Sequence, residues 1–425
     1  MDNQLQEYRK ISLGIIEGSL EAPPSKSITH RLFIMAALSG HPCKIINPLF
    51  SEDTLITLNA LKNMGYDIRS EGNQVVFSGE KKNPTLPIKI KVGNSGTSAR
   101  FLTVFAAFRP GEYNIDGSDR MRQRPMGSLI EALKEMGIEI EHNAGHLPLR
   151  IRGRAAAGGN ASIDATRTSQ FISALLLTAP VTEKGITIVH GGRIASRPYM
   201  DMTITMMRRR GITVHEDENS IRVPGKQDYR IGEVVVEGDF SSASYFVVGA
   251  AITGGELRLS NLANDSLQGD RVILDILEAA GAPIGRETSG IMVQGSEIAG
   301  IDWNMRDCPD LVPAVAVLAL FARGKSRLGG VAHLRYKESD RGQVLADNIS
   351  LLGGKAAISE DELIIEPSAL RGQKIRTHND HRMAMSFAVA GLKIPGISIE
   401  NPGCVEKSYP TFWADFERLS GKSGS

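Results

Sequence analysis

The amino-acid sequence repeats a supersecondary unit of about 70 residues, and this periodicity constrains its fold most strongly. In each copy a helix ends at a glycine, followed by a short strand, a polar turn and a second strand. Glycine suits the helix end because it takes a positive φ without a Cβ penalty. The expected glycines are Gly65, Gly137, Gly211, Gly281 and Gly354, with a shortened last copy at Gly421. The pattern predicts six like units in one chain.

The other half of each unit is a polar segment that opens an almost wholly apolar helix. Such a helix is expected to be buried on all sides, and the polar residues before it suit its N-terminal cap. The expected segments are 25–38, 93–108, 164–179, 238–252, 307–322 and 377–392. A boundary near residues 230–236 would divide the 425 residues into two domains of three units each.

Composition argues against several classes of protein. Lys+Arg is 49 and Asp+Glu is 48, and the net charge of +1 argues against a general binder of nucleic acid or membrane surfaces. The three cysteines are scattered and form no CxxC, so neither a disulfide framework nor a zinc site is indicated. Residues 1–18 lack a signal-peptide core, and the longest apolar run, 311–322, is too short to span a bilayer. We expect a cytoplasmic protein with free thiols.

The six polar helix starts also carry residues that suit anion binding. A helix N-terminus holds about half a positive charge and unpaired N–H groups. Any single start is best interpreted as a cap, but here reactive and cationic side chains recur at the same place in the repeat. They include Lys26 and Arg31 at the first start, the glycine-rich segment 93–100 at the second, and 379–382 at the sixth. The pattern predicts a site for anionic substrates.

Five segments, three of them helix starts and two of them charged loops, resemble the enolpyruvyl transferases in this order, and the resemblance covers nearly the whole chain. They are 25–31, 93–100, the arginine-rich loop 120–125, 337–341 and 379–384. The resemblance implies an α/β fold of two domains, with six βαβαββ repeats (three per domain) and buried parallel helices. It implies an N-terminal domain at 22–234 and a C-terminal domain at 1–21 plus 235–425. The active site is then expected in the cleft between them.

The resemblance is closest to the members that act on shikimate 3-phosphate. It implies transfer of the enolpyruvyl group of phosphoenolpyruvate to the 5-hydroxyl of that substrate, in the pathway to chorismate and the aromatic amino acids. Neither a metal nor an organic cofactor is implied. We expect a monomer with no nucleic-acid or membrane partner. Because Gly96 leaves room for a phosphonate, we also expect glyphosate to compete with phosphoenolpyruvate.

The family's site residues carry over to this chain position by position. Asp310 is expected to accept the 5-hydroxyl proton and Glu338 to relay a proton to the methylene carbon, with Lys26 as the alternative donor. The residues expected at shikimate 3-phosphate are Lys26, Ser27, Arg31, Thr168, Ser169, Gln170, Ser196, Tyr199, Asp310, His333 and Lys337. The residues expected at phosphoenolpyruvate are Lys26, Asn94, Gly96, Arg124, Gln170, Arg341, Arg382 and Lys407.

Three positions depart from the family's usual pattern. Phe101 stands where many members have proline, His333 where asparagine is common, and Thr168 where serine is common. These departures concern individual substrate contacts rather than the reaction.

Two other functions are considered. The sister transferases that act on UDP-N-acetylglucosamine have Lys-Asn at the first helix start and typically a cysteine in the arginine-rich loop. This chain has Lys26-Ser27 and no cysteine between Arg120 and Pro125. A non-catalytic protein that binds anions or RNA ends on a similar repeat fold would not need the three catalytic candidates together.

Overall fold

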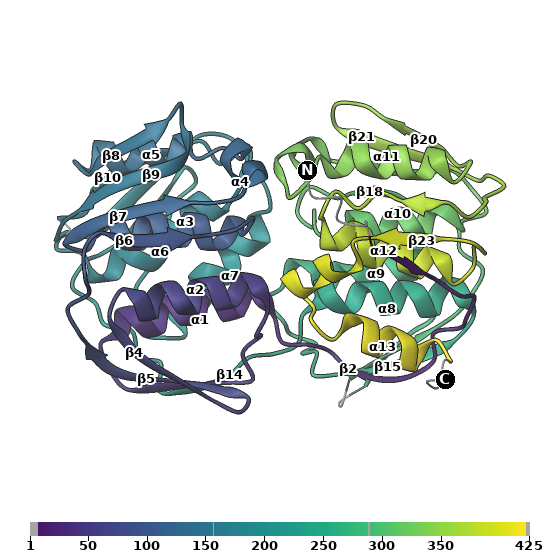
Figure 1. Ribbon diagram of the computed structural model, residues 1–425, viewed down its shortest axis with the longest axis horizontal. Helices are drawn as coiled ribbons and strands as arrows, with labels where there is room; N and C mark the ends of the chain where they lie inside the picture. Colours follow the sequence, from purple (N-terminus) through teal and green to yellow (C-terminus); the bar gives the residue numbers. More distant parts are fainter. Residues whose placement is uncertain (1–6, 156, 288–289, 422–425) are drawn as a thin grey trace. The chain divides into compact units, whose positions relative to one another are not determined.

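The computed structural model describes residues 7–155, 157–287 and 290–421. The chain forms two compact units, which Figure 1 shows in sequence colours. We call Pro24–Val236 the central unit, and Met1–Pro23 together with Glu237–Ser425 the terminal unit. The chain therefore passes between the units twice, at residues 23–24 and 236–237.

In the central unit the described residues form three four-stranded sheets of one topology. Two strands pair in parallel, and the second also pairs with the nearer strand of an antiparallel hairpin. The strand orders are β14-β3-β5-β4, β6-β7-β9-β8 and β10-β11-β13-β12. The strands are β3 (Cys43–Ile46), β4 (Tyr66–Glu71), β5 (Gln74–Lys81), β6 (Ile88–Lys91), β7 (Gly111–Asp116), β8 (Glu139–Asn143), β9 (His146–Gly153), β10 (Gly159–Ile163), β11 (Ile186–His190), β12 (His215–Glu216), β13 (Ser220–Val223) and β14 (Glu233–Val235).

The terminal unit repeats the same topology over its described residues. Two sheets have four strands, in the orders β16-β17-β15-β2 and β18-β19-β21-β20, and the third is β1-β23-β22. In that third sheet β1, from the start of the chain, pairs antiparallel with β23 and takes the place of the inner hairpin strand. The strands are β1 (Tyr8–Lys10), β2 (Gly18–Glu21), β15 (Glu256–Ser260), β16 (Ile284–Glu287), β17 (Gly290–Gln294), β18 (Asp302–Asn304), β19 (Ser326–Gly329), β20 (Lys355–Ile358), β21 (Glu362–Glu366), β22 (Lys374–Ile375) and β23 (Ser398–Glu400).

The six expected apolar helices are present and form the cores. They are α1 (Lys26–Ser39), α3 (Gly96–Ala107), α6 (Gln170–Thr178), α8 (Phe240–Thr253), α10 (Val312–Leu320) and α12 (His381–Gly391). In the central unit α3 packs against α1 and α6, and in the terminal unit α10 packs against α8 and α12 (Figure 1). Every residue of α10 is buried, as expected for a helix that is apolar on all sides. The predicted architecture of six like units, three in each half, is confirmed.

The helices of the second set are only partly buried; most of them lie against strands, whereas α7 packs against α6. These helices are α2 (Glu52–Asn63), α4 (Asp119–Gln123), α5 (Gly127–Glu135), α7 (Arg197–Arg208), α9 (Ile273–Ala279), α11 (Arg341–Leu351) and α13 (Phe412–Leu419). Short 3-10 turns complete the elements: η1 (Ala179–Val181), η2 (Gly269–Val272), η3 (Ala332–Tyr336) and η4 (Pro402–Lys407).

One predicted helix end is wrong by a residue. The left-handed glycine after α11 is Gly353, with φ 83°, and not Gly354. Gly353 N donates to Ser350 O (3.0 Å) and Gly354 N donates to Ile349 O (2.9 Å). These two bonds form a Schellman motif, in which the first residue beyond the helix takes the positive φ. Two adjacent glycines left the choice open in the sequence, and the hydrogen bonds decide it.

Within the described residues, none of the helices combines the length and the apolar character that a membrane crossing would need.

Candidate functional site

In the central unit the starts of α1, α3 and α6 meet α7 through polar side chains. Gln170, the first residue of α6, donates from Nε2 to Thr97 Oγ1 at the start of α3 (3.1 Å). Arg31 on α1 donates from Nε to Thr203 Oγ1 on α7 (2.7 Å), and that hydroxyl lies 3.1 Å from Ser173 Oγ on α6. Several helix N-termini and a buried cation therefore share one place, which favours an anionic ligand.

Arg31 uses all three of its nitrogens to hold other expected site residues. Besides the bond from Nε, Nη1 donates to Ser27 O (2.9 Å) and Nη2 to Tyr199 O (2.8 Å). The side chain is buried, and burial lowers its pKa to about 10, so it stays charged at neutral pH. Arg31 thus holds the main-chain carbonyls of Ser27 and Tyr199, and its contact with substrate stays a prediction.

Lys26, at the first position of α1, pairs with a residue that the sequence analysis missed. Its Nζ lies 3.2 Å from Asp53 Oδ2, and Asp53 is only 2% exposed. Asp53 belongs to the first turn of α2. In the sequence, an acidic residue at this place indicates only a favourable interaction with the helix dipole. Its role in orienting Lys26 depends on α1 and α2 packing together.

The glycine-rich segment 93–100 lies against two arginines. Arg124, which follows α4, donates from Nη1 to Asn94 O (3.0 Å) and lies 3.4 Å from Asn94 Oδ1. A Cβ at Gly96 would stand 2.5 Å from both Arg100 Nη1 and Arg124 Nη2. The absence of a side chain at Gly96 thus lets two guanidinium groups reach the N-terminus of α3. Asn94, Gly96 and Arg124 therefore lie close together at the N-terminus of α3.

The starts of α6 and α7 provide further hydroxyl groups. Ser169 is buried at the N-cap of α6, and Thr168 Oγ1 accepts from Gln170 N (3.2 Å). Ser196, at the N-cap of α7, has φ 56° and ψ 44°. A non-glycine residue in this left-handed region costs on the order of 1–3 kcal/mol, and such strain clusters at ligand sites.

In the terminal unit, Arg341 lies among three carboxylates. Its Nη1 donates to Asp310 Oδ1 (2.8 Å), its Nη2 to Glu338 Oε2 (2.7 Å) and its Nε to Asp380 Oδ2 (2.8 Å). Arg382, in the first turn of α12, donates from Nη2 to Asp310 Oδ2 (2.8 Å). Asp310 therefore bridges the two arginines expected at phosphoenolpyruvate, and Glu338 shares one of them.

The charge state of Asp310 follows from these pairs. Burial disfavours its carboxylate, but Arg382, Arg341 and Lys337 outweigh burial and hold the pKa of Asp310 well below its usual range. A carboxylate in two ion pairs is a weak base. Its side chain is still 23% exposed, so a ligand can reach it. Asp310 would gain basicity if an anion drew the two guanidinium groups away.

The remaining expected residues of the terminal unit lie on two 3-10 turns. His333 is on η3, and burial, followed by the charge of Lys337, lowers its pKa to about 3. The imidazole is therefore neutral at pH 7. Within the described residues, His333 Nε2 has no hydrogen-bond partner. Lys337 follows η3, and Lys407 is buried at the end of η4.

Besides Asp53, two more residues with structural roles at the site were not predicted as site residues. Thr203 holds Arg31, and Asp380 accepts from Arg341 and, at 3.0 Å, from Ser339 Oγ. Asp380 belongs to a motif that the sequence singled out, but its pairing with an arginine 39 residues away is not readable from spacing. Nothing in the sequence indicates a site role for Thr203, because hydroxyl side chains are common on half-buried helices.

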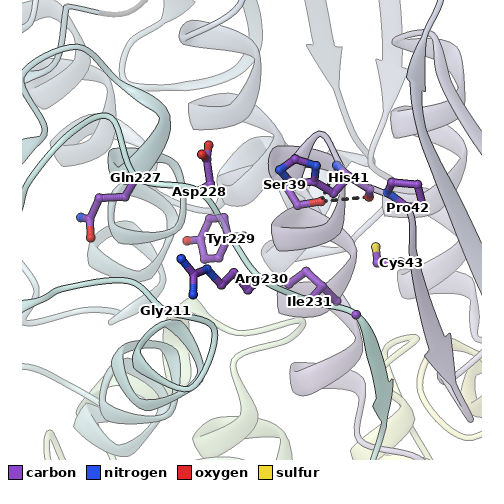
Figure 2. A pocket seen from close by; sticks show the side chains of 11 residues that line it. Ser39, His41, Pro42, Cys43, Gly211, Gln227, Asp228, Tyr229, Arg230 and Ile231 are labelled. Carbon is purple, nitrogen blue, oxygen red and sulfur yellow. Dashed lines mark hydrogen bonds between the residues drawn. The ribbon is translucent and has the colours of Figure 1, made fainter.

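A separate pocket of about 730 Å³ lies in the central unit at the C-terminal end of α1. Figure 2 shows His41, Tyr229 and Arg230 around it, with Ser39 Oγ hydrogen-bonded to His41 O (3.3 Å). Along α1 this end is about 20 Å from the helix start. None of the expected site residues lines this pocket, so it contributes nothing to the candidate site.

No group of three or more His, Cys, Asp or Glu side chains in the described part of the chain is arranged to hold a metal ion. Cys43, Cys308 and Cys404 are free thiols.

Comparison with known proteins identifies the family. The family model for EPSP synthase (3-phosphoshikimate 1-carboxyvinyltransferase) matches residues 13–416. The 3-phosphoshikimate 1-carboxyvinyltransferase of Syntrophobacter fumaroxidans is 42% identical over 411 residues, covering 95% of this chain and 97% of that protein. The solved EPSP synthase from Acinetobacter baumannii is 29% identical with a TM-score of 0.81, covering 98% of both chains. The enolpyruvyl transferase NikO from Streptomyces tendae shares the fold (TM-score 0.78, 14% identity, 97% of both chains). The chain belongs to the EPSP synthase family.

Proposed function

We propose that this chain transfers the enolpyruvyl group of phosphoenolpyruvate to the 5-hydroxyl of shikimate 3-phosphate, as a 3-phosphoshikimate 1-carboxyvinyltransferase of the shikimate pathway. The family assignment carries this proposal. The chemistry of the two units agrees with it. One gathers cations and helix starts around Lys26 and Arg124, and the other holds Arg341 and Arg382 against two carboxylates that can move protons.

The reaction adds an alcohol to an enol carbon and then eliminates phosphate. Protonation of the methylene group makes the neighbouring carbon cationic, and the 5-hydroxyl attacks it while losing its proton. The tetrahedral intermediate collapses, with loss of a methyl proton and departure of phosphate. The site must therefore bind two polyanions, accept one proton and deliver another to carbon.

We assign the two substrates to residues of both units. Shikimate 3-phosphate is bound by Ser27, Arg31, Thr168, Ser169, Gln170, Ser196, Tyr199, Asp310, His333 and Lys337. Phosphoenolpyruvate is bound by Asn94, Gly96, Arg124, Gln170, Arg341, Arg382 and Lys407, and Lys26 contacts both substrates. The planar guanidinium forks suit carboxylate and phosphate groups.

Phosphoenolpyruvate itself activates the base in this proposal. In this structure Asp310 accepts hydrogen bonds from Arg341 and Arg382 at 2.8 Å each. The carboxylate and phosphate of phosphoenolpyruvate compete for the same two arginines. As these guanidinium groups turn to the substrate, the pKa of Asp310 rises and the carboxylate can take the 5-hydroxyl proton.

Glu338 is the proposed proton relay to the methylene carbon, with Lys26 as the alternative. Glu338→Gln keeps an oxygen that can accept from Arg341 but carries no transferable proton. We expect kcat to fall by a factor on the order of 10²–10⁴, with a smaller change in KM. Steady-state kinetics would show this, and Lys26→Met is the companion variant. Near-normal turnover of Glu338→Gln would assign the proton to Lys26.

A phosphate-release assay tests the function. Phosphoenolpyruvate is supplied with shikimate 3-phosphate in one arm and with UDP-N-acetylglucosamine in the other. We expect phosphate and the enolpyruvyl product only in the first arm. Release in the second arm alone would identify the sister transferase. No release in either arm, with binding retained, would favour a non-catalytic anion-binding protein.

We further propose that the enzyme works as a monomer in the cytoplasm. The three free thiols support a reducing compartment. Light scattering on the purified chain would test the oligomeric state.

A further inference from the structure

We infer that Asp270 is a positioning residue for the reaction: a buried carboxyl group that packs on the same face of α8 as Arg382 and whose ionisation weakens phosphoenolpyruvate binding. The inference rests on the proposed function, and it assigns a role to a buried acid that the mechanism above does not use.

Asp270 is held inside the terminal unit by the first turn of α8. It lies on η2 and is 1% exposed. Ser241 Oγ donates to Asp270 Oδ2 in a short hydrogen bond. One helical turn further along α8, Tyr245 Oη lies 3.1 Å from Arg382 Nη1. Because residues four apart share one face of a helix, Asp270 and Arg382 contact the same face of α8.

Charged groups from every neighbouring element act on Asp270. Burial raises its pKa most, the carboxylate of Asp310 raises it further, Arg382 lowers it, the Ser241 hydroxyl lowers it, and Asp239 at the start of α8 raises it. The resulting pKa is about 7. Cys308 faces the same place, and burial and the charge of Asp270 help to raise the pKa of its thiol. The thiol therefore stays neutral while Asp270 titrates.

The charge balance of the cluster shows why ionisation opposes the substrate. Arg341 and Arg382 are already paired with the carboxylates of Asp310, Glu338 and Asp380. Ionised Asp270 adds one more negative charge to this cluster. Phosphoenolpyruvate would bring further negative charge to the same arginines. Binding is then tightest when Asp270 is protonated, and by linkage the substrate raises the pKa of Asp270.

Ionisation of Asp270 should make the binding of phosphoenolpyruvate depend on pH. Below pH 7 Asp270 is mostly protonated and the arginines are available, whereas above pH 7 its carboxylate competes with the substrate. The KM for phosphoenolpyruvate should therefore rise as pH increases through about 7. A coupling of ordinary size predicts a rise of about five-fold or more. The phosphate group of the substrate titrates too, so the comparison must be between variants at the same pH.

The experiment measures kcat and the KM for phosphoenolpyruvate from pH 5.5 to 9 in the full chain. We expect the ratio of the wild-type KM to that of Asp270→Asn to climb across this range, because the amide cannot ionise. Ser241→Ala removes the hydroxyl that donates to the carboxylate, so the pKa of Asp270 should rise. The pH at which the KM for phosphoenolpyruvate increases should then be higher than in the wild type. The exposed Asp275→Asn on α9 is the matched control and should keep the wild-type profile.

A constant ratio would overturn the inference, because a merely structural role would change KM equally at every pH. If Asp270→Asn fails to fold, as judged by circular dichroism, Ser241→Ala serves as the test. A dependence of KM on pH identical to that of the wild type would then overturn the inference. Wild-type phosphate release is measured first. Failure of the proposed function is therefore seen before any variant is compared.

Discussion

Single residues at the site are held by tertiary contacts more than by their own conformational preferences. Arg341 is 1% exposed and satisfies three carboxylates that come from three different segments. In the low dielectric of the interior such pairs are strong, and removal of one partner leaves a buried charge. Gly96 has the opposite role, since its lack of a side chain makes room for Arg100 and Arg124.

Gly96→Ala is expected to weaken phosphoenolpyruvate binding. The new methyl group would stand 2.5 Å from the terminal nitrogens of Arg100 and Arg124, so both guanidinium groups must move. We expect the KM for phosphoenolpyruvate to rise about ten-fold, equivalent to one lost charge-assisted hydrogen bond. The inhibition constant for glyphosate should rise at least as much.

Steady-state kinetics with glyphosate as inhibitor measures both effects. Gly127→Ala is the matched control, because the nearest atoms to its new Cβ are 4.0 Å away. An apparent KM for phosphoenolpyruvate that does not change with glyphosate concentration would show that the two do not compete for this subsite.

His333 is expected to make the protein sensitive to acid. Its folded pKa of about 3 lies below the 6.5 of an unperturbed histidine. The unfolded chain therefore binds a proton that the folded chain does not, and stability is lost as pH falls from about 6.5 towards 3. Between pH 7 and pH 5 this amounts to about 2 kcal/mol.

His333→Asn should remove this loss, which urea unfolding at pH 7 and pH 5 would measure. The exposed His215→Asn on β12 serves as the control and should behave as the wild type does. Equal acid sensitivity in His333→Asn and the wild type would show that His333 is not held neutral in the folded protein.

At the scale of elements, the helix ends form the site, and their caps set its geometry. The start of α2 carries Asp53, which lies 3.2 Å from Lys26. That start depends on Thr54, whose Oγ1 accepts from Ser51 N (2.9 Å) and donates to Leu49 O (2.6 Å). All of these groups are buried, so no water can replace a lost bond.

Thr54→Val should destabilise the protein by about 1–3 kcal/mol, because the isosteric side chain leaves a buried N–H and a buried carbonyl without their partner. The midpoint of urea unfolding would report the change. Thr85→Val, at an exposed position, should stay within about 0.5 kcal/mol of the wild type. If both variants unfold at the wild-type midpoint, Thr54 is not the cap that its geometry indicates.

At the scale of the whole molecule, each unit has its own core and its own set of site residues, and the chain joins them twice. The proposed reaction needs both sets, because Lys26 and Arg124 belong to one unit and Asp310 and Arg382 to the other. Substrates that bind both sets would draw the units together.

Small-angle X-ray scattering should therefore show a smaller radius of gyration when phosphoenolpyruvate and shikimate 3-phosphate are both present. UDP-N-acetylglucosamine with phosphoenolpyruvate is the matched control and should give no compaction beyond that of phosphoenolpyruvate alone. An unchanged radius with both substrates would argue against closure.

The sequence alone determined the architecture. The spacing of glycines and apolar helices predicted six repeats. A helix buried on all sides needs apolar residues on every face, and a left-handed helix end favours glycine, so both features are visible in the sequence. The motifs also indicated the family and the residues that carry charge.

Only the tertiary structure decided which polar and charged side chains form pairs. The pairs Lys26–Asp53, Arg31–Thr203 and Arg341–Asp380 join residues 27 to 172 positions apart. The tertiary structure also decides which groups are buried, and burial raises the pKa of Asp270 and lowers that of His333. These effects depend on distance and on exclusion of water, and both are properties of the packed chain and not of its order of residues.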